Sequence, residues 1–194
     1  MHDRDEEDRR LIDAVRGGDR AAFLALLSAH GPSVRRLARV ITGRDADADD
    51  VLQDTFLSAW RGREALRSDG SPRAWLLAIA RNAARRRVRR EALVRAEEPS
   101  LLDLGLAAGW GAEDDADPES LAAAHADREA LARALESLPH DDREVIVLRD
   151  LDGLSGEEVA ATLGLSLAAQ KSRLHRARLR LMAALREGGG HGRT

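Results

Sequence analysis

Cysteine and tyrosine are absent from this chain of 194 residues, and aromatic residues make up only 3% of it. Without cysteine there is no disulfide framework and no thiolate metal site, which fits a reducing cytosol. The longest apolar stretch, which contains Trp75 to Ala80, is far shorter than the roughly 20 residues of a membrane-spanning helix. The N-terminus, MHDRDEEDRR, is charged and has no signal-peptide core. We therefore expect a soluble protein located in the cytoplasm.

The sequence also lacks the patterns that would indicate an enzyme. It contains no glycine-rich phosphate loop and no nucleophile elbow. Its 6 histidines do not occur at metal-ligand spacing; they are His2, His30, His125, His140, His175 and His191. We therefore expect no catalytic activity, no bound metal and no cofactor.

Charge is distributed unevenly along the chain, although the formal net charge is only −3. Between Ala96 and Glu119 there are many acids and neither lysine nor arginine. A basic cluster lies on each side of this acidic segment. The first comprises Arg81, Arg85, Arg86, Arg87, Arg89, Arg90 and Arg95, and the second comprises Lys171, Arg173, Arg176, Arg178 and Arg180. This order predicts two cation-rich modules separated by a segment that nucleic acid repels.

Hydrophobic periodicity indicates an all-α protein, because apolar residues recur at steps of three and four and no run alternates as a strand would. Residues 1–95 form the first predicted domain, a compact unit of four helices. Their apolar stripes lie within residues 11–15, 23–41, 51–60 and 75–83. An interruption or kink of the second helix at Gly31-Pro32 stays open. Ser71 before Pro72 predicts the N-cap and first turn of the fourth helix.

The second predicted domain, residues 118–187, follows a flexible acidic linker at residues 96–117 and precedes a disordered tail at residues 188–194. Four helices are expected in it. The first begins at the cap Asp117-Pro118, and the second covers Asp141 to Leu151. The third begins at the capping box Ser155–Glu158, and the fourth runs from Ser166 to about Glu187. Two small helical domains joined by a linker are the predicted architecture.

The last two helices have the spacing of a helix-turn-helix, with Gly164 in the turn. The apolar residues predicted to lock them together are Val159, Leu163, Leu165, Leu167, Leu174 and Leu181. The predicted polar outer face comprises Lys171, Ser172, Arg173, His175, Arg176 and Arg178. Such a helix fits the major groove of DNA, where its early residues meet base edges and its later cations meet phosphates. The alternative is a charged helix that is only solvated by water.

The first basic cluster admits two interpretations. Its arginines either contact nucleic acid or form a face that is neutralised by acids elsewhere in the protein. Trp60 and Trp75 lie on apolar stripes, so we expect both in the core. An aromatic ring exposed near the arginines would instead be suited to stack on a base.

Two stretches together resemble a known family. DADADDVLQDTFLSAW (Asp45–Trp60), followed by PRAWLLAIARNAARRRVRR (Pro72–Arg90), resembles region 2 of a bacterial RNA polymerase sigma factor. LESLPHDDREVIVLRDLDGLSGEEVAATLGLSLAAQKSRLHRARLRL (Leu135–Leu181) resembles region 4. Because no region 3 lies between them, the chain is similar to the extracytoplasmic-function (ECF) group.

The resemblance implies a sigma factor that binds core RNA polymerase and directs promoter-specific transcription initiation through the −10 and −35 elements of promoter DNA. It assigns core-polymerase binding to Asp50, Gln53 and Asp54. It assigns the −10 element to Arg73, Arg81, Asn82, Arg85 and Arg86, with residues 67–71 as the pocket for an extruded base. It assigns the −35 element to Lys171, Ser172, Arg173, His175, Arg176 and Arg178. An anti-sigma factor is a further partner that the resemblance implies.

Two positions depart from the family pattern. Ser71-Pro72 stands where the family usually has an aromatic residue before the W-L motif, which implies a differently built melting loop. Gln170 stands where an apolar residue is common. Its spacing from Leu174 and Leu181 favours an inward side chain with a hydrogen-bond partner, while a rotated helix would let it reach a base.

Two further hypotheses concern the linker and the class of protein. The acidic linker, with Trp110 as its one large anchor, is predicted to lie in the positively charged RNA channel of the polymerase. The alternative to a sigma factor is a stand-alone helix-turn-helix transcriptional regulator, which would bind duplex DNA tightly without polymerase. A purely structural scaffold is disfavoured by the charge asymmetry.

Overall fold

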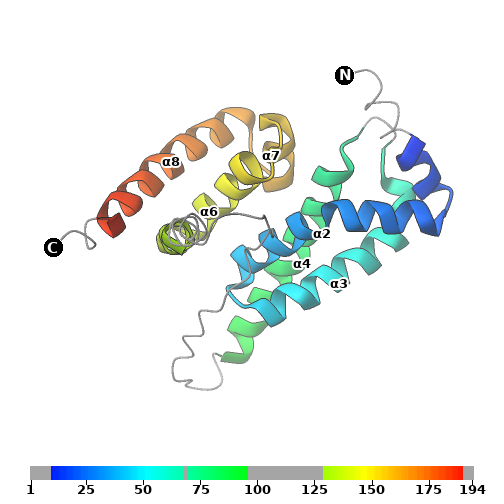
Figure 1. Ribbon diagram of the computed structural model, residues 1–194, viewed down its shortest axis with the longest axis horizontal. Coiled ribbons are helices and arrows are strands. Elements are labelled where there is room, and N and C mark those ends of the chain that lie inside the picture. The colour runs from blue at the N-terminus through cyan, green and yellow to red at the C-terminus, as the bar shows by residue number, and fades with distance from the viewer. Residues whose placement is uncertain (1–9, 68–69, 96–128, 190–194) are drawn as a thin grey trace, which may run out of the picture.

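The computed structural model describes residues 10–67, 70–95 and 129–189. These residues are helical almost throughout and contain no β-strand, which confirms the predicted all-α class. Figure 1 shows two groups of helices, with α2, α3 and α4 in one group and α6, α7 and α8 in the other. The predicted linker, including Trp110, and the chain beyond residue 189 lie outside the described residues.

The first module begins with a short helix at residues 10–16. Gly17 and Gly18 end it as predicted, and Gly18 has a φ of 86°, a left-handed conformation that glycine adopts without steric cost. Helix α2 (Arg20–Thr42) follows directly. Asp19 caps it, because its Oδ1 accepts hydrogen bonds from the N–H groups of Ala21 and Ala22 at 2.8 and 3.1 Å.

Pro32 lies inside α2 without interrupting it. A proline removes one N–H donor and leaves the carbonyl four residues earlier without its helical partner. Here that carbonyl belongs to Ser28, which is exposed to water. Leu26 and Leu37, both 0% exposed, hold the two halves of the helix against the core. Burial on both sides of the proline therefore outweighs the lost hydrogen bond.

Helices α3 (Asp45–Arg61) and α4 (Pro72–Arg95) pack against α2 and against each other. The short 3-10 helix η1 (Arg63–Ala65) lies in the connection between them. Ser71 caps α4 as predicted, since its Oγ accepts a hydrogen bond from the N–H of Ala74 at 3.1 Å. Of the caps in this module, the one at Ser71 was therefore predictable from the sequence.

Two tryptophans pack where their apolar stripes predicted. Trp60 and Trp75 are partly buried against the core. The ring of Phe23 lies 5.0 Å from that of Trp60, and the guanidinium carbon of Arg63 lies 4.7 Å from the centre of the Trp60 ring. The second contact is a cation–π interaction. Trp60 is therefore held by packing on one side and by a charge on the other.

The second module consists of a helix at residues 129–137, α6 (His140–Ile146), the π-helical turn η2 (Val147–Leu151), α7 (Gly156–Leu163) and α8 (Leu167–Gly189). The predicted helix from Asp141 to Leu151 is therefore α-helical at its start and π-helical at its end. The N–H of Asp152 donates to the carbonyl of Val147 at 2.8 Å, which is the i to i+5 bond of a π-turn. Helix α8 continues past its predicted end at Glu187.

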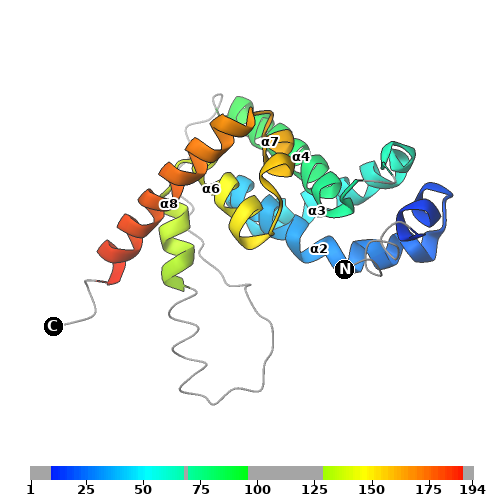
Figure 2. The same ribbon diagram turned by 90° about the horizontal axis from the view of Figure 1, so that it is seen from above.

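The two modules are in direct contact. Helix α4 lies against α7 and α2 lies against α6, an arrangement that can be followed in Figure 2. The buried apolar residues of both modules form one continuous cluster. Polar contacts cross as well: Arg73 Nη1 donates to the carbonyl of Asp152 at 2.7 Å, and Arg143 Nη1 donates to the carbonyl of Val40 at 3.3 Å. Sequence periodicity did not predict this contact.

Candidate nucleic-acid and polymerase interfaces

Helices α7 and α8 form the predicted helix-turn-helix. At the start of α7, the N–H of Glu158 donates to Ser155 Oγ at 3.2 Å and the N–H of Ser155 donates to Glu158 Oε2 at 2.7 Å, which is the predicted capping box. Gly164 ends α7 with a φ of 68°, a conformation that glycine favours. Ser166 Oγ then accepts a hydrogen bond from the N–H of Ala169 at 3.2 Å. These caps fix the turn and the direction in which α8 leaves it.

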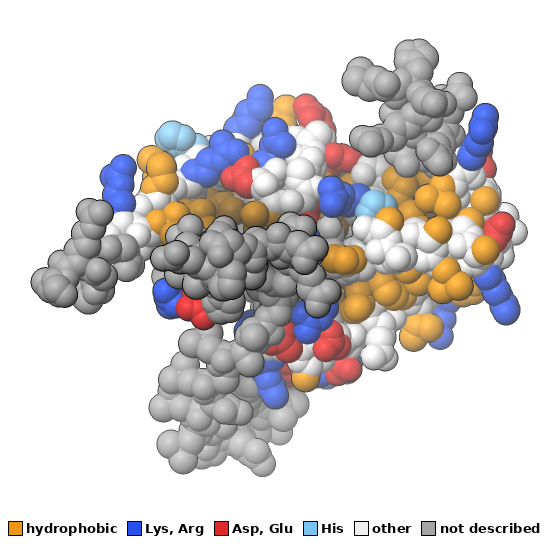
Figure 3. Space-filling view, viewed as in Figure 1, with side chains coloured by type: hydrophobic (Ala, Val, Ile, Leu, Met, Phe, Trp, Pro, Cys, Tyr) orange, Lys and Arg blue, Asp and Glu red, His pale blue; other side chains and the backbone are white. Residues whose placement is uncertain are grey.

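The first half of α8 has a buried and an exposed face. Gln170, Leu174 and Ala177 are buried. Of the predicted −35 residues, Arg173 is partly buried, and the exposed ones are Lys171, Ser172, His175, Arg176 and Arg178. Figure 3 shows basic side chains gathered over α8. The exposed face therefore offers charged and hydrogen-bonding groups on the early turns, where a major-groove helix needs them.

Carboxylates of the same module hold two of the predicted −35 arginines. Arg178 forms two hydrogen bonds with Asp150, from Nη2 to Oδ1 at 2.6 Å and from Nε to Oδ2 at 3.0 Å. The hydrogen bond to Asp150 raises the pKa of Arg178. Arg173 Nη1 lies 3.3 Å from Asp141 Oδ2. Both guanidinium groups are therefore oriented before any ligand is bound.

Gln170 is almost completely buried, with 1% of its surface exposed. Its Oε1 points toward the start of α7, where a Cβ added to Gly156 would lie 3.5 Å from it. Its Nε2 has no hydrogen-bond partner among the described residues. The inward placement is therefore as predicted, whereas the amide nitrogen lacks the partner that we expected. A buried side chain cannot read a base in this conformation.

The predicted −10 residues of α4 divide into two groups. Asn82 and Arg86 are exposed. The other three, Arg73, Arg81 and Arg85, bond to the second module. Residues 68 and 69 of the predicted base pocket lie outside the described residues. The predicted −10 surface is therefore partly open and partly covered.

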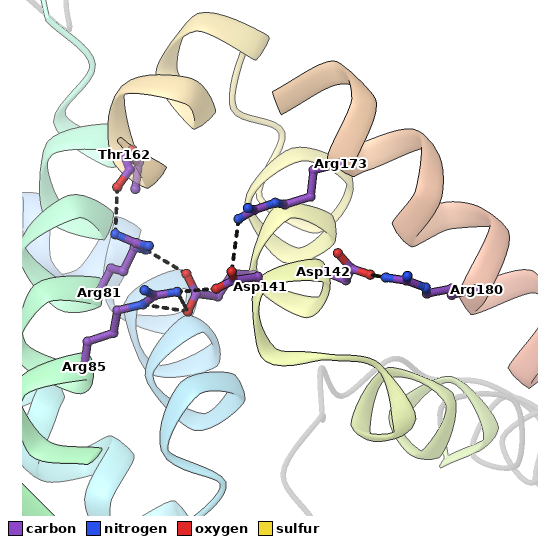
Figure 4. A network of polar contacts seen from close by, with 8 residues as sticks. Arg81, Arg85, Asp141, Asp142, Thr162, Arg173 and Arg180 are labelled. Carbon is purple, nitrogen blue, oxygen red and sulfur yellow. Dashed lines mark hydrogen bonds and ion pairs between the residues drawn. The ribbon is translucent and has the colours of Figure 1, made fainter. Parts of the chain in front are cut away.

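Figure 4 shows the network that covers it. Arg81 Nε donates to Glu144 Oε2 at 2.7 Å, and its Nη1 donates to the carbonyl of Thr162 at 3.2 Å. Arg85 donates to Glu144 Oε1 from Nε at 3.0 Å and from Nη2 at 2.9 Å, and to Asp141 Oδ1 from Nη2 at 2.7 Å. Burial acts to lower the pKa of Arg85, but its bonds to Glu144, and then to Asp141, raise it overall. In this conformation acids neutralise Arg81 and Arg85, which agrees for these two residues with one of the two interpretations of the cluster, whereas Arg86 is exposed.

The acids of α6 are site residues that sequence reasoning missed. Asp141 and Glu144 meet α4, while Asp142 pairs with Arg180 of α8, as Figure 4 also shows. The signal available in the sequence was the cluster of acids itself, whose charge is opposite to that of the two basic clusters. Its position in the sequence did not tell which basic cluster it meets.

The predicted polymerase-binding residues lie on one exposed face of α3. Asp50, Gln53 and Asp54 are exposed, and at steps of three and four they share a side of the helix. Leu57 continues this face and is 55% exposed. It was missed, although an apolar residue off the inward stripe was a usable signal. Arg87 of α4 lies 2.9 Å from Asp50 Oδ2 and so holds this carboxylate in place.

Apolar and acidic groups thus occur together on α3. Figure 3 shows hydrophobic side chains gathered over α2 and α3. A helix that combines exposed carboxylates with an exposed leucine suits a partner that presents basic and apolar side chains.

The described part of the chain contains neither a candidate membrane-spanning helix nor a candidate metal site. None of its helices is long and apolar enough to cross a membrane. None of its groups of histidine, aspartate and glutamate side chains could hold a metal ion.

Both modules match known protein families. Residues 26–94 match sigma-70 region 2, and residues 128–181 match sigma-70 region 4. The chain is 40% identical over 186 residues to the RNA polymerase sigma factor CnrH of Cupriavidus metallidurans, a match that covers 93% of this chain and 95% of the relative. It is 32% identical over 178 residues to the ECF RNA polymerase sigma-E factor of Escherichia coli K12, with 88% and 90% covered.

Two solved structures resemble the arrangement of helices. The structure of CnrH in complex with the cytosolic domain of CnrY has a TM-score of 0.64 and 32% sequence identity, and the match covers 93% of this chain and 97% of that one. The sigma factor RpoE in complex with the anti-sigma factor NepR from Bartonella quintana has a TM-score of 0.69 and 28% identity, with 84% and 96% covered. Both similarities extend over most of this chain.

Proposed function

From the premise that this chain belongs to the extracytoplasmic-function group of bacterial RNA polymerase sigma factors, we propose which of its surfaces bind polymerase and promoter DNA. As a sigma factor it works with core RNA polymerase and directs promoter-specific transcription initiation. This assignment is favoured over a stand-alone helix-turn-helix regulator, because regulators of that kind have no use for a region 2 module.

The exposed face of α8 carries the proposal for the −35 element. Lys171, Ser172, His175 and Arg176 are exposed, while Gln170 between the turn and this face is buried. The exposed side chains occupy the first turns after a capped, glycine-containing turn, which are the turns that enter the major groove in a helix-turn-helix. We assign base contacts to these early residues and phosphate contacts to Arg173 and Arg178.

The first module is assigned the remaining two surfaces. Core polymerase binds the face of α3 with Asp50, Gln53 and Asp54. The exposure of Leu57 on the same face supports including it. The non-template strand of the −10 element follows α4, along the residues Arg73, Arg81, Asn82, Arg85 and Arg86. Arginine suits this strand because its planar group both bonds phosphate and stacks on bases.

An anti-sigma factor is the proposed regulatory partner. Support comes from the similar structure of RpoE, which is a complex with the anti-sigma factor NepR. The protein itself is proposed to act without catalysis and without a cofactor, and to be located where the polymerase is, in the cytoplasm.

Run-off transcription with purified core polymerase tests the −35 assignment. Arg176→Ala is expected to lower transcription about tenfold from a promoter with an intact −35 element, because one specific base or phosphate contact contributes about 1–3 kcal/mol. Arg186→Ala, an exposed arginine near the other end of α8, is the matched control and should leave transcription unchanged. Equal losses in the two variants would contradict the assignment.

A gel shift separates the sigma factor from the stand-alone regulator. The full chain is expected to bind promoter duplex weakly alone and strongly with core polymerase. Saturation of a duplex site by the purified chain at the same concentration with and without polymerase would favour the regulator.

A further inference from the structure

Two of the proposed −10 arginines are bonded to carboxylates of the −35 module. Arg81 is 11% exposed and Glu144 is 2% exposed in their side chains, and 2.7 Å separates Arg81 Nε from Glu144 Oε2. Arg85 completes the coordination of Glu144 through Oε1. Both oxygens of this buried carboxylate therefore accept hydrogen bonds from α4, and both guanidinium groups donate to it.

A proposed −35 residue contacts the second acid that holds Arg85, Asp141. Asp141 Oδ1 accepts from Arg85 of α4 at 2.7 Å, while its Oδ2 lies 3.3 Å from Arg173 of α8. Figure 4 shows Arg85 and Arg173 reaching Asp141 from two sides. The two proposed DNA-binding surfaces thus meet at Asp141, and Glu144 binds only the α4 side. We call these two carboxylates the Asp141–Glu144 pair.

A carboxylate and a phosphate compete for the same donors of an arginine. Each offers anionic oxygens to the planar fork, with similar distances and geometry. A guanidinium that is 11% exposed cannot reach a DNA phosphate until the carboxylate leaves. Opening that pair is costly because it separates two charges that are already out of water. A DNA phosphate offsets the free energy lost on breaking the arginine–carboxylate pair only if it forms an equivalent charged hydrogen bond with the same arginine.

Other contacts hold the modules in the same arrangement. Arg36 Nη2 of α2 lies 3.5 Å from Asp152 Oδ1, and Arg73 Nη1 of α4 donates to the carbonyl of Asp152 at 2.7 Å. Asp152 itself is 0% exposed. The closed arrangement is therefore built by several side chains, and the Asp141–Glu144 pair is the part that also covers DNA-binding groups.

We propose that Asp141 and Glu144 act as internal phosphate mimics, which keep the free chain closed and mask its DNA-binding arginines until the strand of the −10 element displaces them. This inference rests on the proposed role of Arg81 and Arg85 in DNA binding. It makes the −35 module an inhibitor of the −10 surface within one chain, without any second protein.

The first test measures the distance between the modules without DNA. Because the chain has no cysteine, Ser28→Cys on α2 and Ala183→Cys on α8, both at exposed positions, give a specific pair of labels for spin-label or fluorescence distance measurements. Glu144→Gln and Asp141→Asn are each expected to raise the open-to-closed ratio about tenfold, since each removes a charged hydrogen-bond acceptor. Glu187→Gln changes the charge equally at the far end of α8 and should leave the ratio unchanged.

The second test measures binding of a short single-stranded DNA by fluorescence anisotropy. Glu144→Gln is expected to bind it about tenfold more tightly than the unaltered chain, and the DNA is expected to lengthen the label distance in both. Circular dichroism checks that Glu144→Gln is folded. Should it unfold, Asp141→Asn decides the question alone, because the Asp141 side chain is 52% exposed and its amide is tolerated on the surface.

Three outcomes decide the proposal. Opening together with tighter DNA binding supports it. An unchanged distance in the folded variants, or opening without any gain in DNA affinity, overturns it. The proposed role of the arginines fails separately if Arg85→Ala leaves run-off transcription by the assembled polymerase unchanged.

Discussion

Replacing Gln170 with methionine is expected to stabilise the protein. The side chain is 1% exposed, and its Nε2 lacks a hydrogen-bond partner among the described residues. In the folded state this N–H₂ group has lost water without gaining an acceptor, whereas in the unfolded chain it bonds to water. Methionine has a similar length and no polar donor, so it removes this penalty and keeps the space filled.

The magnitude follows from two opposing terms. An unsatisfied buried donor costs about 1–3 kcal/mol, and imperfect packing of a volume-conserving replacement costs less than about 1.5 kcal/mol. We therefore expect a net gain of about 1 kcal/mol in the free energy of unfolding. For small domains this raises the midpoint of thermal unfolding by about 4–8 °C, and by about 2–4 °C if the whole chain unfolds as one unit.

Thermal unfolding followed by far-UV circular dichroism measures the change. Gln53→Met is the matched control, because Gln53 is the chain's other glutamine and is exposed on α3. It should leave the midpoint nearly unchanged. Run-off transcription from promoters with single changes in the −35 element measures the second quantity, the base preference, which Gln170→Met should not alter.

Two results would refute this reasoning. A loss of stability in Gln170→Met would mean that the amide is well bonded and that its hydrogen bonds are worth more than the apolar packing. A changed base preference at the −35 element with unchanged stability would mean that Gln170 reaches DNA, so that α8 rotates when it binds.

Three further predictions concern other sites. Asp152→Asn is expected to raise the free energy of unfolding by about 1 kcal/mol at neutral pH, because burial raises the pKa of this carboxyl group and so disfavours its charged form. The charged form reduces stability as the pH rises through the folded-state pKa. Urea titrations should therefore show no stability gain for Asp152→Asn below pH 3.8, the ordinary pKa of the group. Ser155→Ala removes the capping box and should lower the free energy of unfolding by about 1 kcal/mol in urea; an unchanged value would mean that water replaces the cap. Arg178→Ala should change stability by less than about 1 kcal/mol, because its partner Asp150 is at the surface, yet it should lower run-off transcription; a large loss of stability instead would assign it a structural role.

Local features of the fold were predictable because they depend on residues close together in the sequence. The cap at Ser71, the capping box at Ser155 and Glu158, and the glycine end of α7 at Gly164 each involve a few successive residues. Helical spacing placed Gln170 on the inward side for the same reason. The uncertain point at Pro32 was decided by packing, because buried leucines on both sides keep α2 continuous.

The residues proposed to bind polymerase and the −10 element were assigned through the family resemblance, whereas the polar face of α8 was already predicted from the helix-turn-helix spacing. Burial and contacts between helices could not be predicted from spacing. Leu57 joins the α3 face because exposure depends on which neighbours cover a helix. The partial burial of Arg173 depends in the same way on α6, which brings Asp141 next to it.

The sequence by itself determined the all-helical class, the two modules, the caps and the helix faces, since an α-helix is set by hydrogen bonds and side-chain spacing within a few residues. Only the tertiary structure decided how the modules meet. Arg81 and Glu144 are separated by 63 residues, and Arg85 and Asp141 by 56. A charge pattern shows that such groups can attract each other, but which pairs form depends on the shapes of two packed surfaces, and no local rule contains those shapes.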